Sequence, residues 1–416
     1  MSQTEVQLIK TNAVQTGDIA NSAVTDEKIA GLTSSKLTGA LPAISGASLT
    51  NLPASGKAKN LIVNGSCRVA QRGQSSTSNL YATVDRFRFA YSGVDENPTN
   101  AQVDVASGTT PYTLGFRKAV KVTNGNQTSG AGSADRIAFE YRIEAQDIAG
   151  SGWNYASASS NITLSFWIKS SVAQNFYFNF IAPDGTSYNY PMETGSLTAD
   201  TWTKITKTIP GNSNLTFNND NGVGLQIDWW AFAGTNYTAS GVTLNQWAAY
   251  SSGNRFPDNP SPWWTTNDAT LEITGVQLEV SDHATDFEHL TYADELRRCQ
   301  RYFYKTYRQG ITPGTASISA DITVKRNEDY NSGRTDHEFN AYYSVPMRAT
   351  PTLTFYSYAG TENKFTNANV DFSGATEGTI AGTVYHGRKK LSHISMSNSV
   401  GAGKFCFFHF TASAEL

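Results

Sequence analysis

The stretch LEITGVQLEVSDHATDFEHLTYADELRRCQRYFYK, residues 271–305, decides how the chain is divided. Its first ten residues are rich in aliphatic and β-branched side chains between polar segments, which is typical of the last strand of a sheet. A helix is expected next, because Thr291 with Asp294 three positions later forms a capping-box pattern. Side chains at helical spacing then share one face, namely those of Tyr292, Leu296, Cys299 and Phe303. The segments before and after this helix are therefore expected to be different folding units.

Length and composition limit the class of protein. A chain of 416 residues is too long for one ordinary core, so two or three domains are expected. Charged residues make up only 16% and aromatic residues 12%, a composition that favours β structure. The net charge of −3 and the lack of a Lys/Arg cluster with interleaved aromatics argue against nucleic acid as a partner. The sequence has neither a secretory signal pattern nor eighteen consecutive apolar residues, so we expect no membrane insertion.

Residues 1–58 contain regularly spaced apolar residues that one chain alone cannot bury. The segments NAVQTGDIA and NSAVTDEKIA place an aliphatic residue at every fifth position, and sparser leucines follow. This spacing matches neither the helix nor the strand period, so it gives a single chain no apolar face. Side-by-side copies would bury it, and the alternative is a disordered tail. The predicted oligomerisation residues of this fibrous shaft or attachment segment are Val14, Ile19, Val24, Ile29, Leu32 and Leu37.

Residues 59–290 are expected to form an antiparallel β-sandwich, with a jelly-roll as the best single topology. Short alternating patterns such as LSFWIKS, NFYFNFIAP, TWTKITKTI and GLQIDWWAFAG each carry one apolar face. In LSFWIKS that face consists of Leu164, Phe166 and Ile168. A linking helix is predicted over residues 291–309, and residues 310–416 are expected to form a C-terminal β-sandwich domain. The fold class is therefore mainly β, with one short linking helix.

All eight tryptophans lie between residues 153 and 264. In the pair Trp229–Trp230 the strand pleat sends the two rings to opposite faces, so one of them is expected in the core. Trp230, together with Trp263 and Trp264 in a proline-rich loop and the nearby Asp268, is a candidate glycan site, because sugar C–H faces pack on aromatic rings. The alternative is that these indoles fill the sandwich core or a subunit contact.

Signs of catalysis or of a cofactor are missing from the sequence. It has no nucleophile elbow, no phosphate-binding loop, no H-E-x-x-H pattern and no dinucleotide fingerprint. Three widely spaced cysteines, Cys67, Cys299 and Cys406, indicate neither a disulfide framework nor a zinc site. We therefore predict a protein that is not an enzyme and that has no cofactor and no metal. A glycan-cleaving enzyme remains an alternative, because its paired carboxylates need not be close in sequence.

Several motifs resemble those of bacteriophage tail fibre and receptor-binding proteins. They are NLIVNGSCRVAQRG with Val84-Asp85-Arg86-Phe87, the segments GVQLE, Ala-Thr before Phe-Glu-His, and Cys-Gln-Arg-Tyr-Phe, and finally VPMRATPT and ASAEL. One departure is Ala70, which stands where the family has an aromatic residue. Asp85 and Arg86 are interpreted as members of a buried structural ion pair that fixes the first hairpin.

The resemblance implies a carbohydrate-binding-like jelly-roll and a homotrimer located in the virion tail and assembled in the host cytoplasm. It also implies partners: other tail or virion proteins through the N-terminal segment, and a host cell-surface glycan or protein receptor, with residues 310–416 as the candidate receptor-binding tip. An alternative is a structural virion adaptor or decoration protein without receptor contact.

Overall fold

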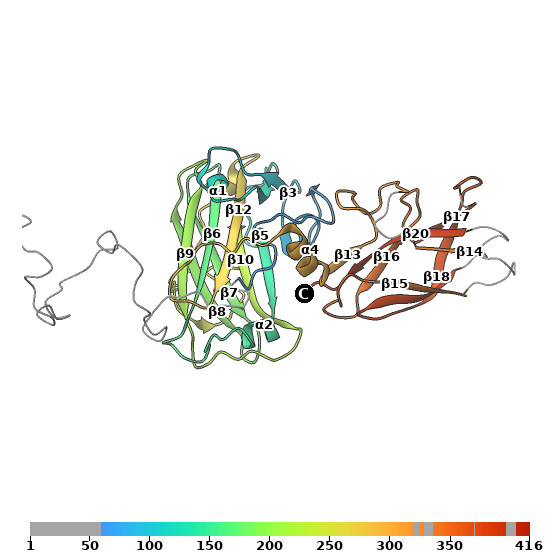
Figure 1. The fold of residues 1–416 in the computed structure, drawn as a ribbon. Coiled ribbons are helices and arrows are strands. Elements are labelled where there is room, and N and C mark those ends of the chain that lie inside the picture. Colours follow the sequence, from blue (N-terminus) through green and yellow to red (C-terminus); the bar gives the residue numbers. More distant parts are fainter. Residues whose placement is uncertain (1–59, 319–323, 328–335, 370, 397–404) are drawn as a thin grey trace, which may run out of the picture. The chain divides into compact units, whose positions relative to one another are not determined.

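The computed structural model describes residues 60–318, 324–327, 336–369, 371–396 and 405–416. All of them belong to one compact unit, Ala58–Leu416. This unit is mainly β, as predicted, and its strands form three antiparallel sheets (Figure 1). The predicted oligomerisation residues Val14, Ile19, Val24, Ile29, Leu32 and Leu37 lie outside the described residues, so the shaft stays a prediction.

Sheet 1 has six strands in the order β1-β3-β4-β12-β6-β9. Every pair of neighbours is antiparallel. The strands are β1 (Ser75–Ser76), β3 (Thr99–Asp104), β4 (Lys118–Thr123), β12 (Thr270–Glu279), β6 (Asn161–Ser170) and β9 (Thr203–Pro210).

Sheet 2 also has six strands, in the order β11-β8-β7-β10-β5-β2, and it forms the second layer of the sandwich (Figure 1). They are β11 (Ala248–Ala249), β8 (Tyr188–Ser196), β7 (Asn175–Ala182), β10 (Val223–Ala233), β5 (Arg136–Glu144) and β2 (Phe87–Ser92). The four strand patterns expected from the sequence within residues 164–234 correspond to β6, β7, β9 and β10. Three short helices interrupt the strands, namely α1 (Thr110–Thr113), α2 (Ala145–Ala149) and α3 (Pro262–Thr265).

The core lies between these two sheets. The predicted inward face of β6 is buried as expected, and it packs against the inward aromatic side chains of β7 and β10. The ring of Phe166 meets Phe178 edge-on at 5.1 Å and Trp229 at 5.8 Å, both as T-shaped contacts between ring centroids. Burial of each such aromatic side chain contributes on the order of 2–3 kcal/mol. Because alternate strand residues fill this space, the intervening residues of β6 are left on the outer face of sheet 1.

Helix α4 (Tyr292–Gln300) begins where the capping pattern predicts, and the Thr291 hydroxyl accepts a hydrogen bond from the Asp294 main-chain nitrogen at 3.2 Å. The helix is shorter than the predicted range 291–309. Phe303, expected on its apolar face, lies instead in β13 (Phe303–Lys305), which pairs with β20. After the helix, Phe303–Lys305 are extended because they pair with the end of β20, and the side chains of Arg301 and Tyr302 in between both donate to Glu144.

Sheet 3 contains the remaining strands, in the order β13-β20-β17-β18-β19-β15, with β14 and β16 also paired to β20. They are β14 (Val324–Asn327), β15 (Asp336–Tyr342), β16 (Thr352–Tyr356), β17 (Lys364–Ala368), β18 (Thr376–His386), β19 (Lys390–Met396) and β20 (Phe405–Ser413). Most strand pairs of this sheet thus involve β20, whose side chains from Cys406 to Ala412 are buried.

Candidate functional site

The tryptophans proposed from the sequence as a glycan platform are buried. Trp230, Trp263 and Trp264 are exposed by only 1%, 0% and 1%. The exposed platform is therefore wrong, and the alternative of a core role holds. Trp229 and Trp230 do point to opposite faces of β10, but the outer face at Trp230 is covered by Phe256 and Tyr237. Asp268 is exposed, yet the two tryptophans of α3 beside it face inward.

Trp230, Trp263 and Trp264 each have their indole N–H satisfied, which offsets the cost of burying it. Trp230 Nε1 donates to Asn179 Oδ1 at 3.0 Å. Trp263 Nε1 donates to the Thr270 main-chain oxygen at 3.1 Å, and Trp264 Nε1 to that of Gly130 at 2.9 Å. A buried indole keeps its hydrophobic gain when its one donor is paired. These residues are part of the scaffold.

A different aromatic surface lies on the outer face of sheet 1. Trp167 of β6 is half-buried there, directly opposite Lys204 of β9 in the strand register. A pocket of about 250 Å³ opens beside it. Its apolar walls come from Leu114, Phe116, Trp167 and Phe287, with His289 at the rim, and its polar groups come from Ser165, Lys204, Thr285 and Asp286. We call this the sheet 1 pocket.

Three rings form one wall of the sheet 1 pocket. Phe116 meets Phe287 at 4.9 Å and His289 at 5.2 Å, and Phe287 meets His289 at 4.9 Å. Phe116 can lie against the sheet because Gly275 stands beneath it, where a Cβ atom would come within 2.7 Å of the ring. Gly275 also has a positive φ of 63°, which glycine adopts without strain.

The segment that carries Phe287 and His289 is held by the end of β12. The carboxylate of Glu279 accepts hydrogen bonds from the main-chain nitrogen of Thr285 at 2.9 Å and from its hydroxyl at 2.6 Å. Gln277 accepts from the main-chain nitrogen of Glu288 at 2.8 Å. His289 Nε2 donates to the Leu114 main-chain oxygen at 2.9 Å, which fixes the ring. GVQLE and the Phe-Glu-His motif therefore position one wall of this pocket.

The strand alternation in LSFWIKS contained a signal for this site. Because Leu164, Phe166 and Ile168 face the core, Trp167 between them must lie on the outer face. No local pattern predicted that residues 285–289 would line the pocket, because their position depends on how this loop folds back over the sheet.

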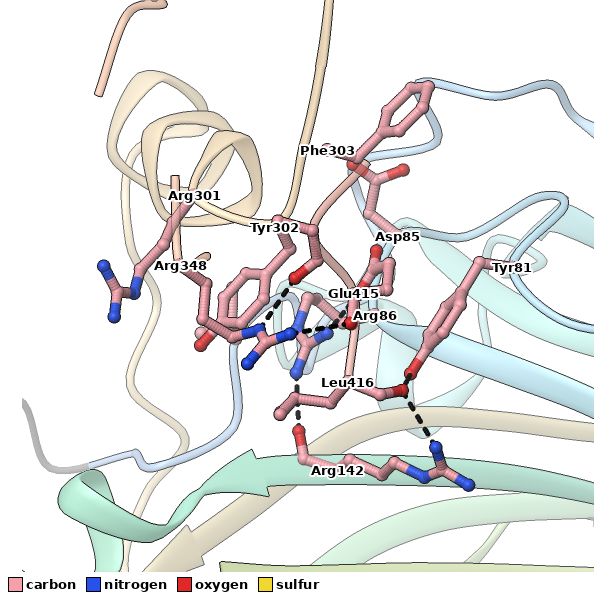
Figure 2. A network of polar contacts seen from close by, with 12 residues as sticks. Tyr81, Asp85, Arg86, Arg142, Arg301, Tyr302, Phe303, Arg348, Glu415 and Leu416 are labelled. Carbon is pink, nitrogen blue, oxygen red and sulfur yellow. Dashed lines mark hydrogen bonds and ion pairs between the residues drawn. The ribbon is translucent and has the colours of Figure 1, made fainter. Parts of the chain in front are cut away.

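The other shared motifs meet in a buried polar network, shown in Figure 2. Arg86 is 1% exposed, and its guanidinium forms an ion pair with Glu415 and lies 3.6 Å from the Tyr302 ring centre. Burial alone would lower the pKa of Arg86, but Glu415 and the neighbouring tyrosine hydroxyls together outweigh burial, and the pKa is raised well above its usual value. Asp85 has other partners, since it accepts from the Gln71 main-chain nitrogen at 2.9 Å. The predicted buried charges are present, but Arg86 pairs with the ASAEL motif rather than within the first hairpin.

The network extends through residues of the other motifs. Arg348 of VPMRATPT donates to the main-chain oxygens of Ala414 at 2.8 Å and Glu415 at 3.0 Å. The Leu416 main-chain oxygen accepts from Tyr81 at 3.0 Å and from Arg142 at 2.9 Å (Figure 2). These contacts join residues of the sandwich to the end of β20. Because its charges are matched by opposite charges or main-chain oxygens, we interpret the network as structural.

Metal-binding and membrane-spanning features are missing from the described ranges. There, no group of three or more His, Cys, Asp or Glu side chains lies close enough to hold a metal ion. No helix in the same ranges is long and apolar enough to span a bilayer. Cys67, Cys299 and Cys406 are all buried.

Known proteins resemble this chain only distantly. No protein-family model and no curated protein matches the sequence. Among solved structures, the enzymatically active domain of tailspike protein 4 from bacteriophage CBA120 is 10% identical, with a TM-score of 0.29, over 53% of this chain and 21% of that chain. The N-terminal cellulose-binding domain of Cellulomonas fimi β-1,4-glucanase C is 12% identical, with a TM-score of 0.25, over 51% of this chain and 98% of that chain.

A family 11 carbohydrate-binding module of a Clostridium thermocellum cellulase is 11% identical, with a TM-score of 0.23, over 50% of this chain and 96% of that chain. This chain therefore spans about a fifth of the tailspike and nearly all of the two binding modules. Scores this low carry no argument about function, which must be inferred from the residues of this chain.

Proposed function

We propose that this protein is a tail fibre or tail-tip protein of a bacteriophage virion, and that it attaches the virion to a glycan on the host surface through the sheet 1 pocket. The observation that carries the proposal is a coincidence of two features. Gly275, Thr285, Phe287 and His289 belong to the stretches that resemble phage receptor-binding proteins, and the same residues line the aromatic pocket.

The chemistry of the pocket suits a sugar ring. Trp167 and Phe287 offer apolar ring surface to the C–H face of a pyranose, while Ser165, Thr285 and Lys204 offer hydroxyl and ammonium groups to its hydroxyls. A volume of about 250 Å³ lies just below the usual range for ligand pockets, so we expect one sugar unit in the pocket and its neighbours outside it. Such a site binds weakly.

Binding without cleavage is part of the proposal. Glycosidases in general need two carboxyl groups that flank the bond to be broken. Among the described residues, Asp286 is the single carboxylate that lines the pocket, and Glu272 on the same face of sheet 1 forms an ion pair with Lys169 at 3.1 Å. The protein should release no reducing ends from host polysaccharide.

Assembly supplies the avidity that a weak site needs. We propose a homotrimer in the virion tail, formed in the host cytoplasm, with Val14 to Leu37 at the shared axis and the N-terminal segment joined to other tail proteins. Several linked copies raise the effective concentration of the second and third sites, so affinities multiply. Native mass spectrometry of the purified protein should give the mass of a trimer, and a monomer would contradict this arrangement.

The test of the glycan site is competition with phage adsorption to host cells. We expect Trp167→Ala to weaken competition by about tenfold or more, because buried tryptophan contacts dominate binding energies. Trp247→Ala is the matched control, since Trp247 is half-buried and packs on Tyr190 of the sandwich, at 5.1 Å between ring centroids. Both variants should keep the far-ultraviolet spectrum of the parent.

Two results would count against the proposal. If the parent protein failed to compete with phage adsorption at all, a structural virion adaptor without receptor contact would be favoured. If folded Trp167→Ala competed as well as Trp247→Ala, attachment would not use the sheet 1 pocket.

A further inference from the structure

The turn between β18 and β19 forms a second unusual surface, on sheet 3. Tyr385 and Tyr342 are each 60% exposed, although most large aromatic side chains of the described residues are buried. Tyr385 packs edge-on against His393 at 5.3 Å, and Lys390 Nζ lies 5.5 Å from the centre of the Tyr342 ring. Strand pairing places them side by side, with Tyr385 opposite His393 and Tyr342 opposite Lys390. We call these residues, with Arg388 and Lys389, the hairpin surface.

Positive charge is concentrated at the hairpin surface. Arg388, Lys389 and Lys390 are consecutive, and the sequence contains no Asp or Glu between Glu377 and Glu415. This contrasts with the net charge of −3 for the whole chain. Glu338 is the acidic residue that the register places opposite His393 on β15. Local charge and global charge therefore have opposite signs.

The backbone holds the basic residues in place. Arg388 Nε donates to the Met347 main-chain oxygen at 2.9 Å, and the Met347 nitrogen donates back to the Arg388 oxygen at 2.7 Å. The Tyr343 nitrogen donates to the Lys389 oxygen at 3.0 Å. A turn that is tied down at two points presents its side chains with less loss of entropy on binding.

An open concavity of about 460 Å³ lies over this turn, and its lining includes Tyr385, His386, Arg388, Lys390 and Ser392. Burial lowers the pKa of His386, which disfavours the charged form of its ring. The positive charge that lines the concavity thus comes from Arg388, Lys389 and Lys390.

We propose that the hairpin surface binds an acidic polysaccharide, with sugar carboxylates on Arg388, Lys389 and Lys390 and sugar rings against Tyr385 and Tyr342. Charge complementarity selects an anionic ligand, and exposed tyrosine rings favour sugar rings as its body. Nucleic acid fits less well, because it calls for a longer basic track than one turn on an acidic chain. This inference rests on the proposed function only for the class of ligand, since the site lies on a different sheet.

Titration calorimetry of the full chain with polygalacturonate tests the proposal. The matched ligand control is the same polymer with its carboxylates methyl-esterified, and a thymidine oligonucleotide serves as a phosphate-rich probe. We expect binding of polygalacturonate that weakens between about 50 and about 200 mM salt, as interactions of exposed charges do, and little binding of the ester.

The variant Lys389→Gln/Lys390→Gln should weaken binding by about tenfold for each charge-assisted hydrogen bond that it removes. Arg297→Gln/Arg308→Gln removes the same charge from exposed positions elsewhere and should bind like the parent. Tyr385→Ala keeps the charge and should still lose affinity. It provides an independent test of the site if the lysine variant does not fold.

Equal binding of polygalacturonate and its ester would overturn the proposal, as would equal affinities of the lysine variant and its control. Tighter binding of the oligonucleotide would replace it with a phosphate-bearing partner. The proposed function fails separately, because Trp167→Ala leaves the hairpin surface intact. A protein that loses host competition on that change but still binds polygalacturonate would confirm that the two sites are distinct.

Discussion

Asp228 shows how a single residue can be held in an unfavourable environment by its strand. It lies in β10, opposite Glu140 of β5, and it is 0% exposed. Its Oδ1 accepts from Gln226 at 2.8 Å, while Oδ2 has no hydrogen-bond partner within the described part of the chain. Burial, together with the Glu140 charge, raises the pKa of Asp228 to about 7. The folded state therefore favours the protonated acid.

This raised pKa makes stability depend on pH. An acid whose pKa is higher in the folded state than in the unfolded chain destabilises the fold increasingly as pH rises from about 4 to about 7. Asp228→Asn mimics the protonated form, so we expect it to increase the free energy of unfolding by about 1–4 kcal/mol at about pH 8. The gain should shrink toward zero at about pH 4.

Urea titrations at the two pH values measure this effect. Asp268→Asn is the control, because Asp268 is exposed in a turn and has a positive φ that asparagine also tolerates. A gain in acid as large as that in mild base would show that Asp228 is ionised to the same extent in the folded and unfolded chains.

Among the elements, α4 is the one whose start was predictable and whose end was not. The N-terminal signal is local, since the Thr291 hydroxyl accepts from the Asp294 nitrogen and donates to its carboxylate at 2.6 Å. The end coincides with long-range contacts, since Phe303–Lys305 pair with β20 and Arg301 donates to Glu144, 157 residues away in the sequence, at 2.8 Å. The local capping pattern therefore predicted the first turn of the helix, but it did not predict the pairing with β20 that begins shortly after the last turn.

Removal of the Thr291 N-cap should destabilise helix α4. We expect Thr291→Ala to lower the free energy of unfolding by about 1 kcal/mol, because one helix N–H loses its acceptor. Thr291→Ser retains the hydroxyl and should lose only a fraction of that. Thermal unfolding of both variants would check the order, and equal losses would mean that the methyl group rather than the hydroxyl matters.

Across the whole molecule, the motifs that resemble those of phage receptor-binding proteins divide into two groups. GVQLE and Phe-Glu-His build the wall of the sheet 1 pocket, whereas Asp85-Arg86, Arg301-Tyr302, Arg348 and Glu415 form the buried network that joins the sandwich to the end of β20. Glu415 is central to that network, since Arg72 also pairs with it at 3.1 Å. The motifs of the buried network therefore stabilise the fold and do not bind a ligand.

Loss of this carboxylate should be costly. Glu415→Ala leaves the buried guanidinium of Arg86 without its counter-charge, and removal of one partner of a buried pair typically costs about 3–5 kcal/mol. The double variant Arg86→Met/Glu415→Ala removes both charges and should be less destabilised than the sum of the two single changes. Guanidinium unfolding of all four proteins gives this coupling, and additive losses would refute the pairing.

The candidate sites were only partly visible in the sequence. Strand alternation placed Trp167 outside the core, but it was silent about Trp263 and Trp264, which a proline-rich loop turns inward onto the sandwich. The basic run at residues 388–390 is visible in the sequence. Its proximity to Tyr342 and Tyr385 follows only from the pairing of β15, β18 and β19. Loop paths and strand pairings join residues far apart in sequence, and no local pattern encodes them.

By itself the sequence determined the mainly β class, the core face of β6 and the start of α4, because side-chain periodicity and capping act over a few residues. The tertiary structure alone decided the order of strands in the three sheets, the partner of Arg86 and the positions of both candidate sites. Those features depend on which distant segments bury each other's apolar surface and satisfy each other's polar groups, and that is a property of the whole fold.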